Sequence, residues 1–220
     1  MIRHVIFDLD GTLVDSCATC VEILSGMLAE RDSGGAAIDP VAARSYMSRG
    51  GLDMVRGLLG DACVDGEADL ADFRARYHAH DTSVETLFPG VAEGLSRLRA
   101  AGLTLSICSN KPQGLCEKVL ADTGLARHFA FVVGGQKGLR PKPAPDLLDA
   151  VLARLGKDAA TCAFVGDSEL DHQVAAAAGI PFYFLTHGYA EPGWKARDCT
   201  IHDSFAPLTD ALLARAAAHA

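Results

Sequence analysis

Two aspartates, Asp8 and Asp10, stand two positions apart directly after the apolar run HVIF, and Gly11 and Thr12 follow them. Two carboxylates held so close repel each other, and each makes the other harder to ionise. A divalent cation between them relieves the repulsion, and Mg²⁺ prefers a few carboxylate oxygens together with water and phosphate oxygens. The pair therefore indicates a site for phosphoryl chemistry, provided that other parts of the chain supply compensating positive charge.

Polar residues that suit such chemistry also follow three later apolar runs: Ser109 with Asn110, Lys142, and Asp167 with Asp171. Ligands bind at the carboxyl ends of the strands in an open parallel sheet, so we expect these groups to line one crevice. Carboxylates, a hydroxyl and a lysine there would bind a phosphoryl group and stabilise its charge during transfer. One aspartate could attack phosphorus while the other moves protons. Taken alone, Ser109 and Asn110 could instead cap a helix, and Asp171 could be an acid favoured by the helix dipole.

The strands that would carry these groups are predicted by five short apolar runs: 4–8, 104–108, 131–134, 162–166 and 182–185. Such nearly continuous hydrophobicity is typical of parallel strands that are covered on both faces. Helical spacing separates the later runs, as at Val91, Leu95 and Leu98. This alternation predicts an α/β fold with a doubly wound, mainly parallel, Rossmann-like sheet.

Residues 17–85 break the alternation, because they contain no strand-like run. Their apolar residues follow helical spacing, and glycine-rich stretches at 33–35 and 48–51 indicate turns. We therefore expect a small all-helical domain, residues 17–85, inserted after the first strand of a core domain made of residues 1–16 and 86–220. Hinges would lie near 16–17 and 86–88, where a closing cap could exclude water.

The composition narrows the range of partners. A net charge of −8 argues against binding to nucleic acid or to an anionic membrane. No apolar run approaches the roughly 18 residues of a membrane span, and the chain starts at once with a strand-like segment, so we expect a cytoplasmic protein. Cys17 and Cys20 form a CxxC pair, but no second pair of ligands at zinc spacing accompanies it. The other cysteines suit reduced, buried thiols.

In their order, these motifs resemble the haloacid dehalogenase superfamily of phosphohydrolases, in the branch with a helical cap after the first strand. The stretch DLDGTLVDS resembles the first motif, CSN the second, Lys142 between its prolines the third, and VGDSELD the fourth. FPG at 88–90 and the GDS form of the fourth motif resemble the phosphoglycolate phosphatase group. In the cap stretch RSYMSRGG, Ser48 and Arg49 replace the Gly-Asn pair that is more usual in that group.

This resemblance implies a Mg²⁺-dependent phosphatase that forms an aspartyl-phosphate on Asp8. Asp10 would act as general acid and then as general base, while Ser109 and Lys142 hold the phosphoryl group. The implied metal-binding residues are Asp8, Asp10 through its backbone carbonyl, Asp167 and, in support, Asp171. The implied substrate-binding residues are Gly11, Thr12, Asn110 and Arg49.

The substrate that the resemblance suggests is 2-phosphoglycolate, a small phosphomonoester. Arg49 could hold its carboxylate with two hydrogen bonds, although an arginine in a turn is equally typical of a solvated surface. The alternatives are a sugar-phosphate phosphatase, a phosphomutase similar to β-phosphoglucomutase, and a non-catalytic binding relative. The insertion contains no lysine, which disfavours the mutase. We expect a monomer or homodimer whose partner is a small phosphorylated metabolite.

Overall fold

The computed structural model describes residues 1–31, 37–156 and 158–217, so the predicted turn at 33–35 lies outside the described residues. The chain forms two compact units. The first consists of Met1–Asp15 and Ser83–Ala220, and the second of Ser16–Thr82. The boundaries expected from the sequence, 16/17 and 85/86, stay a prediction.

The first unit is built on a six-stranded sheet with the order β3-β2-β1-β4-β5-β6, and all neighbouring strands are parallel. The strands are β1 (His4–Phe7), β2 (Thr104–Pro112), β3 (Phe131–Gly135), β4 (Cys162–Gly166), β5 (Phe182–Leu185) and β6 (Thr200–His202). The chain leaves β1 for β2 on one side and later reaches β4 on the other. The sheet therefore has its topological switch point at the end of β1, where ligands bind in doubly wound folds. The predicted fold class is confirmed.

Two details of the sheet differ from the expected strands. β2 extends to Pro112, with an irregular register between the Cys108–Val133 and Pro112–Gly135 pairs. β6 was not predicted, because it is only three residues long and its side chains are mostly exposed. A short edge strand of this kind has no apolar run by which it could be recognised.

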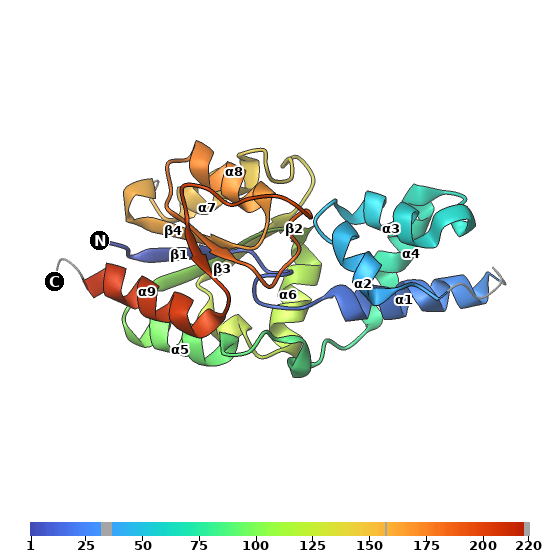
Figure 1. Cartoon of the computed structure of the whole chain (residues 1–220), viewed down its shortest axis with the longest axis horizontal. Coiled ribbons are helices and arrows are strands. Elements are labelled where there is room, and N and C mark those ends of the chain that lie inside the picture. Colours follow the sequence, from blue (N-terminus) through green and yellow to red (C-terminus); the bar gives the residue numbers. More distant parts are fainter. Residues whose placement is uncertain (32–36, 157, 218–220) are drawn as a thin grey trace. The chain divides into compact units, whose positions relative to one another are not determined.

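Helices cover both faces of the sheet, with α5 and α9 on one side and α7 and α8 on the other (Figure 1). The helices of this unit are α5 (Val91–Ala100), α6 (Gln113–Asp122), α7 (Asp146–Arg154), α8 (Glu169–Ala177) and α9 (Phe205–Ala217). Successive residues of β1 point to opposite faces. Phe7 packs its ring against Phe129 and Phe205, whereas Ile6 joins the apolar cluster with Phe164 and Leu148. β1 is therefore fixed from both sides.

The second unit contains only helices among its described elements. They are α1 (Cys17–Glu30), α2 (Pro40–Ala43), α3 (Gly51–Leu59), α4 (Gly66–Ala79) and short 3-10 turns. Its buried side chains include Leu24, Val55 and Tyr77. Arg31 also links two parts of the unit, because its guanidinium forms a bidentate ion pair with Asp69 at 2.5 and 3.1 Å.

The segments that lead out of and back into the first unit pair with each other. The Asp15 amide donates to the Thr86 carbonyl at 2.8 Å, and the Phe88 amide donates to the Leu13 carbonyl at 3.1 Å.

All seven cysteines are free thiols. None of the helices in the described ranges is long and apolar enough to cross a membrane.

Candidate active site

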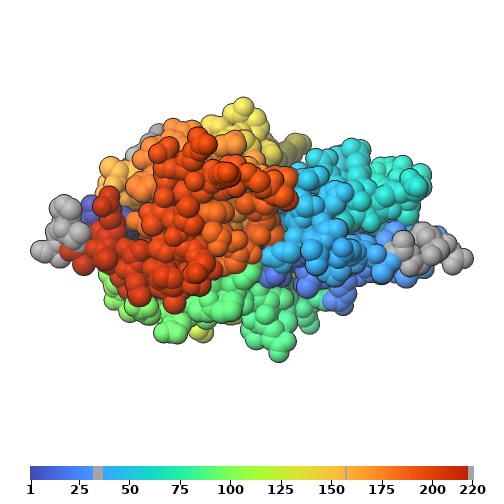
Figure 2. Space-filling view, in the orientation of Figure 1, coloured from blue at the N-terminus to red at the C-terminus, as the bar shows by residue number. Residues whose placement is uncertain are grey.

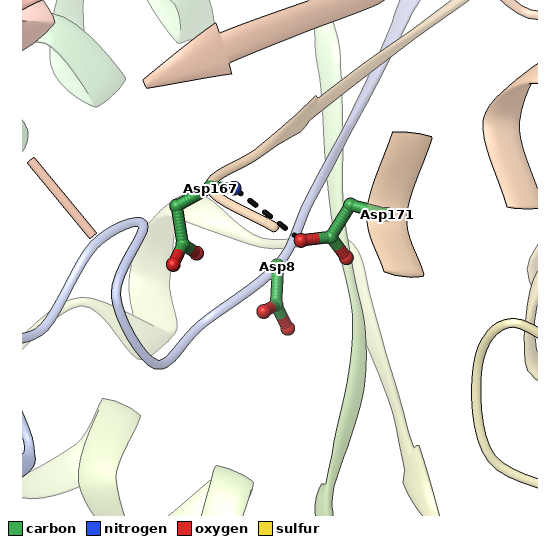
Figure 3. A group of neighbouring side chains, drawn as sticks. All are labelled: Asp8, Asp167 and Asp171. Atoms are coloured by element: carbon green, nitrogen blue, oxygen red, sulfur yellow. Dashed lines mark hydrogen bonds between the residues drawn. The ribbon is translucent and has the colours of Figure 1, made fainter. Parts of the chain in front are cut away.

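Three aspartates come together at the carboxyl end of the sheet (Figure 3). Asp8 follows β1, Asp167 follows β4, and Asp171 lies in the first turn of α8. One carboxylate oxygen of each lies within 4.8 Å of the others, and within the described chain this is the only such group of His, Cys, Asp or Glu side chains. The sequence placed these residues at one edge of the sheet, and the structure brings them together.

Lys142 supplies the positive charge that the aspartates require. Its Nζ atom lies 3.0 Å from Asp8 Oδ1 and 2.5 Å from Asp171 Oδ1, and it donates to the Cys108 carbonyl at 2.9 Å. Asn110 fixes the backbone of this lysine, accepting from its amide at 2.7 Å and donating to its carbonyl at 3.1 Å. Burial opposes the lysine charge, but the carboxylates of Asp171 and Asp8 outweigh it and raise the pKa of Lys142.

The protonation of the aspartates reflects their burial. Burial raises the pKa of Asp8 to about 6, Lys142 opposes the shift, and the charges of Asp171 and Asp10 add to it. Burial and the charges of Asp171 and Asp8 also raise the pKa of Asp167 well above its usual value. One lysine is therefore not enough to offset this group of acids.

The donor set fits a hard divalent cation. Carboxylate oxygens are the ligands that Mg²⁺ takes from proteins, and three of them converge here. Asp8 Oδ1 is buried, and beyond its ion pair with Lys142 no described group makes a hydrogen bond to it. A cation beside that oxygen would supply the positive charge that the described side chains lack.

Asp171 has two structural partners at once. Its Oδ2 accepts from the backbone amide and hydroxyl of Ser168 at 3.2 and 2.6 Å, which completes a capping box at the start of α8. Its Oδ1 lies against Lys142. The sequence left open whether Asp171 was a helix-start acid or part of the site, and the structure gives it contacts of both kinds.

Asp167 accepts two hydrogen bonds and is packed closely against two glycines. Its carboxylate accepts from the Thr12 hydroxyl at 2.6 Å and from the Tyr189 amide at 2.7 Å. A Cβ atom at Gly11 or at Gly188 would overlap Asp167 Oδ2, so both positions require glycine. Gly11 also has a φ of +82°, which favours glycine. The expected substrate-binding roles of Gly11 and Thr12 stay predictions.

Sequence reasoning missed Gly188 and Tyr189. They follow β5, so the strand-end rule that selected the other site residues would have selected them too. The stretch THGYA at 186–190 contains no Asp, Glu, Lys or Arg, however, and Tyr189 reaches Asp167 through its backbone amide. A contact through the backbone leaves no signal in the residue type.

Asp10 and Lys111 form a second ion pair. Lys111 Nζ lies 3.1 and 3.3 Å from the two carboxylate oxygens of Asp10, and the Lys111 amide donates to the Ser109 hydroxyl at 3.3 Å. Ser109 itself is buried at the end of β2. The structure thus makes Lys111 a direct partner of Asp10.

Arg49 belongs to the second unit. It follows a 3-10 turn, and its guanidinium lies 5.0 Å from the centre of the Tyr46 ring, a cation–π arrangement. A Cβ at Gly57 in α3 would overlap that ring, so this glycine provides the space that the ring occupies. A role for Arg49 in substrate binding stays a prediction.

Comparisons with known proteins show the family to which the chain belongs. The family model of haloacid dehalogenase-like hydrolases matches residues 5–185. The plasmid phosphoglycolate phosphatase of Cupriavidus necator is 39% identical over 196 residues, which cover 87% of this chain and 84% of that protein. The phosphoglycolate phosphatase of Rhodospirillum rubrum is 37% identical over 220 residues, which cover 96% and 90%.

A solved structure supports the fold. The crystal structure of a predicted phosphoglycolate phosphatase from Haemophilus somnus superposes with a TM-score of 0.81 at 24% identity. The match covers 96% of this chain and 98% of that one.

Proposed function

Because the chain belongs to the haloacid dehalogenase-like hydrolase family and is a phosphatase, we propose that it hydrolyses 2-phosphoglycolate through an aspartyl-phosphate on Asp8. The observation that carries this proposal is the position of Asp8. It lies at the switch point of the sheet, in contact with Lys142 and beside two further aspartates. Burial raises the pKa of Asp8 to about 6, and Lys142 opposes this shift, so at pH 7 most of the Asp8 carboxyl is ionised, as a nucleophile must be.

In the first step, a carboxylate oxygen of Asp8 bonds to phosphorus while the ester oxygen leaves. Lys142 favours the ionised form of Asp8, and the hydroxyl of Ser109 would donate to a phosphoryl oxygen. Asp10 gives its proton to the leaving alkoxide, which departs as an alcohol.

In the second step, water attacks the phosphorus of the aspartyl-phosphate. Asp10, now a carboxylate, takes a proton from that water, the bond between Asp8 and phosphorus breaks, and inorganic phosphate leaves. Lys111 contacts both carboxylate oxygens of Asp10 and would orient that side chain while it accepts the proton from water.

We propose Mg²⁺ as the cofactor, held by Asp8, the backbone carbonyl of Asp10 and Asp167, with Asp171 in support. Bound there, it supplies positive charge to the phosphoryl oxygens and offsets the repulsion between the carboxylates. Asp167 suits this role because the Thr12 hydroxyl and the Tyr189 amide fix its orientation.

The proposal of 2-phosphoglycolate as substrate rests on the similarity to phosphoglycolate phosphatases and on Arg49 of the second unit. A small ester with its own carboxylate offers a guanidinium a bidentate partner. The face of Tyr46 would restrict the orientation of Arg49 before the substrate arrives. We further propose that the enzyme is cytoplasmic, where free thiols such as these stay reduced, and acts as a monomer or homodimer.

The experiment is a phosphate-release assay on a panel of small phosphate esters, in Mg²⁺ and in EDTA. The Asp8→Asn variant, purified in the same way, is the control for phosphate release by contaminating phosphatases. We expect release to be fastest from 2-phosphoglycolate, to require Mg²⁺ and to be absent in the variant. A preference for sugar phosphates would keep the reaction but replace the substrate. Isomerisation without net phosphate release would indicate a mutase, and unchanged activity of Asp8→Asn would contradict the assignment of the nucleophile.

A further inference from the structure

The loop that follows β5, residues 186–190, makes two kinds of contact through one residue. The backbone amide of Tyr189 donates to Asp167 Oδ2 at 2.7 Å, and its phenol hydroxyl donates to Asp15 Oδ1 at 2.6 Å. The Tyr189 side chain between these two hydrogen bonds is buried, with 3% of the residue exposed. The chain continues from this loop over the face of the first unit that Figure 2 shows in orange and red.

The hydroxyl of Tyr189 reaches the last residue of the chain before the second unit begins. Asp15 ends the first segment of the first unit, and its amide also donates to the Thr86 carbonyl in the returning segment. The ring of His187, from the same loop, stacks on Phe88 with the centres 3.9 Å apart. The loop therefore contacts both the outgoing and the returning segment.

The loop and the Asp167 side chain are packed too closely for one to move without the other. Gly188 and Gly11 approach Asp167 Oδ2 so closely that neither position has space for a Cβ. Close-packed groups of this kind move together, because a separation would open a void and break hydrogen bonds at once. A change in the position of Asp167 therefore displaces the loop and, through the Tyr189 hydroxyl, Asp15.

We propose that Tyr189 is a positioning residue that couples the Asp167 carboxylate to the segment by which the chain leaves the first unit. This inference rests on the proposed function, because it takes the cation to bind at Asp167. A cation that orders Asp167 then orders Asp15 through Tyr189, and by linkage an ordered Asp15 favours binding of the cation.

The experiment is hydrogen exchange of the full chain in Mg²⁺ and in EDTA, on wild type, Tyr189→Phe and Tyr183→Phe. Tyr189→Phe removes only the hydroxyl and keeps the amide that donates to Asp167. Tyr183→Phe is the matched control, since it removes a hydroxyl from a buried tyrosine of β5 whose ring stacks on His202. No substrate or turnover is needed for this readout.

In wild type and Tyr183→Phe, we expect Mg²⁺ to slow exchange in both 186–190 and 13–16. In Tyr189→Phe, the slowing in 186–190 should persist and that in 13–16 should be lost. Half-maximal protection should also need more Mg²⁺, by at most the roughly 10- to 100-fold that one hydrogen bond to a charged group is worth. Equal Mg²⁺-dependent slowing of 13–16 in all three proteins would overturn the proposal.

A second variant tests the same hydrogen bond in case Tyr189→Phe folds poorly. Asp15→Ala removes the acceptor from the other side and should give the same pattern, and the double variant should add nothing further, since both changes break one interaction. Additive effects would overturn the proposal. The two kinds of failure are distinguishable. Equal slowing of 13–16 in all three proteins, with Mg²⁺-dependent phosphate release by wild type intact, refutes only the role of Tyr189. The absence of any Mg²⁺ effect on exchange or on phosphate release in wild type refutes the metal site as well.

Discussion

At the scale of single residues, Lys142 supplies a buried positive charge between two carboxylates. Its side chain is 2% exposed, and it forms ion pairs with Asp8 and Asp171. Removing one member of a buried ion pair is costly, because the charges left behind lose both water and partner. We therefore expect the lysine to stabilise the folded state as well as to take part in the expected chemistry.

We expect Lys142→Met to lower the free energy of unfolding by about 3–5 kcal/mol, the usual cost of an uncompensated buried charge. Urea unfolding at pH 7 in EDTA measures this. The matched control is Lys118→Met, which breaks an ion pair with Asp122 on the surface of α6 and should cost no more than about 1 kcal/mol. Equal losses in the two variants would contradict the assigned role of Lys142.

The raised pKa of Asp8 predicts how stability depends on pH without metal. Folding moves this pKa from 3.8 to about 6, so the folded state binds the proton more tightly. The contribution of Asp8 to stability is therefore fully present below pH 3.8 and is lost as the pH rises through about 6. Asp8→Asn removes it, so the stability of wild type relative to Asp8→Asn, both in EDTA, should fall between pH 4 and 7. A difference that rises over this range would have the wrong sign.

At the scale of loops and helices, close packing is what fixes the site. The loop after β5 reaches Asp167 only because Gly188 has no side chain. We expect Gly188→Ala to displace Asp167 and to raise the Mg²⁺ concentration for half-maximal activity by at least about tenfold, a loss of roughly 1.4 kcal/mol of binding. An activity titration with Mg²⁺ measures this.

Gly26→Ala is the matched control for that substitution. Gly26 lies in α1, and a Cβ atom added there would meet nothing within 4 Å, so alanine should leave the Mg²⁺ requirement unchanged. It should also stabilise the helix by about 0.5–1 kcal/mol. A similar Mg²⁺ requirement in Gly188→Ala and Gly26→Ala would show that the contact with Asp167 has no influence on the metal.

The turn before α3 is the element that would determine substrate choice. We expect Arg49→Ala to raise KM more for phosphate esters with a carboxylate than for those with a neutral tail, because the guanidinium would contact only the carboxylate. The neutral esters are the internal control, and steady-state kinetics on matched pairs measures the difference. Equal changes in KM for both classes would remove Arg49 as a carboxylate ligand.

For the molecule as a whole, a cation bound at the group Asp8, Asp167 and Asp171 would link folding to metal binding. A ligand that binds only the folded state stabilises it by about 2.7 kcal/mol at a hundred times its dissociation constant. We expect Mg²⁺ to raise the melting temperature relative to EDTA, and Asp167→Asn to reduce that rise. Calorimetric scans of both proteins test this, with Na⁺ at matched ionic strength as control. A rise of equal size in the variant would place the stabilising ion elsewhere.

The parts of the molecule that the sequence predicts are those with a local signal. Asp8, Lys142 and Asp167 each follow an apolar run, so the strand-end rule places them together without knowledge of the fold. β6 has no such run. Gly188 matters because it has no side chain that would overlap Asp167, and Tyr189 binds Asp167 through its backbone amide, so the residue types do not reveal either contact. The Asp10–Lys111 pair joins positions 101 residues apart and depends on the directions of two side chains.

The pairing of Asp15 with Thr86 and of Leu13 with Phe88 means that the first unit is closed across the place where the second is inserted. An insertion whose two ends leave from adjacent backbone can be exchanged without disturbing the host, as domain insertions in general show. A transplant would join a foreign helical segment at peptide bonds 15–16 and 82–83 and keep the Tyr189–Asp15 bond on the host side. Such chimaeras would let one phosphoryl-transfer site be paired with many recognition modules.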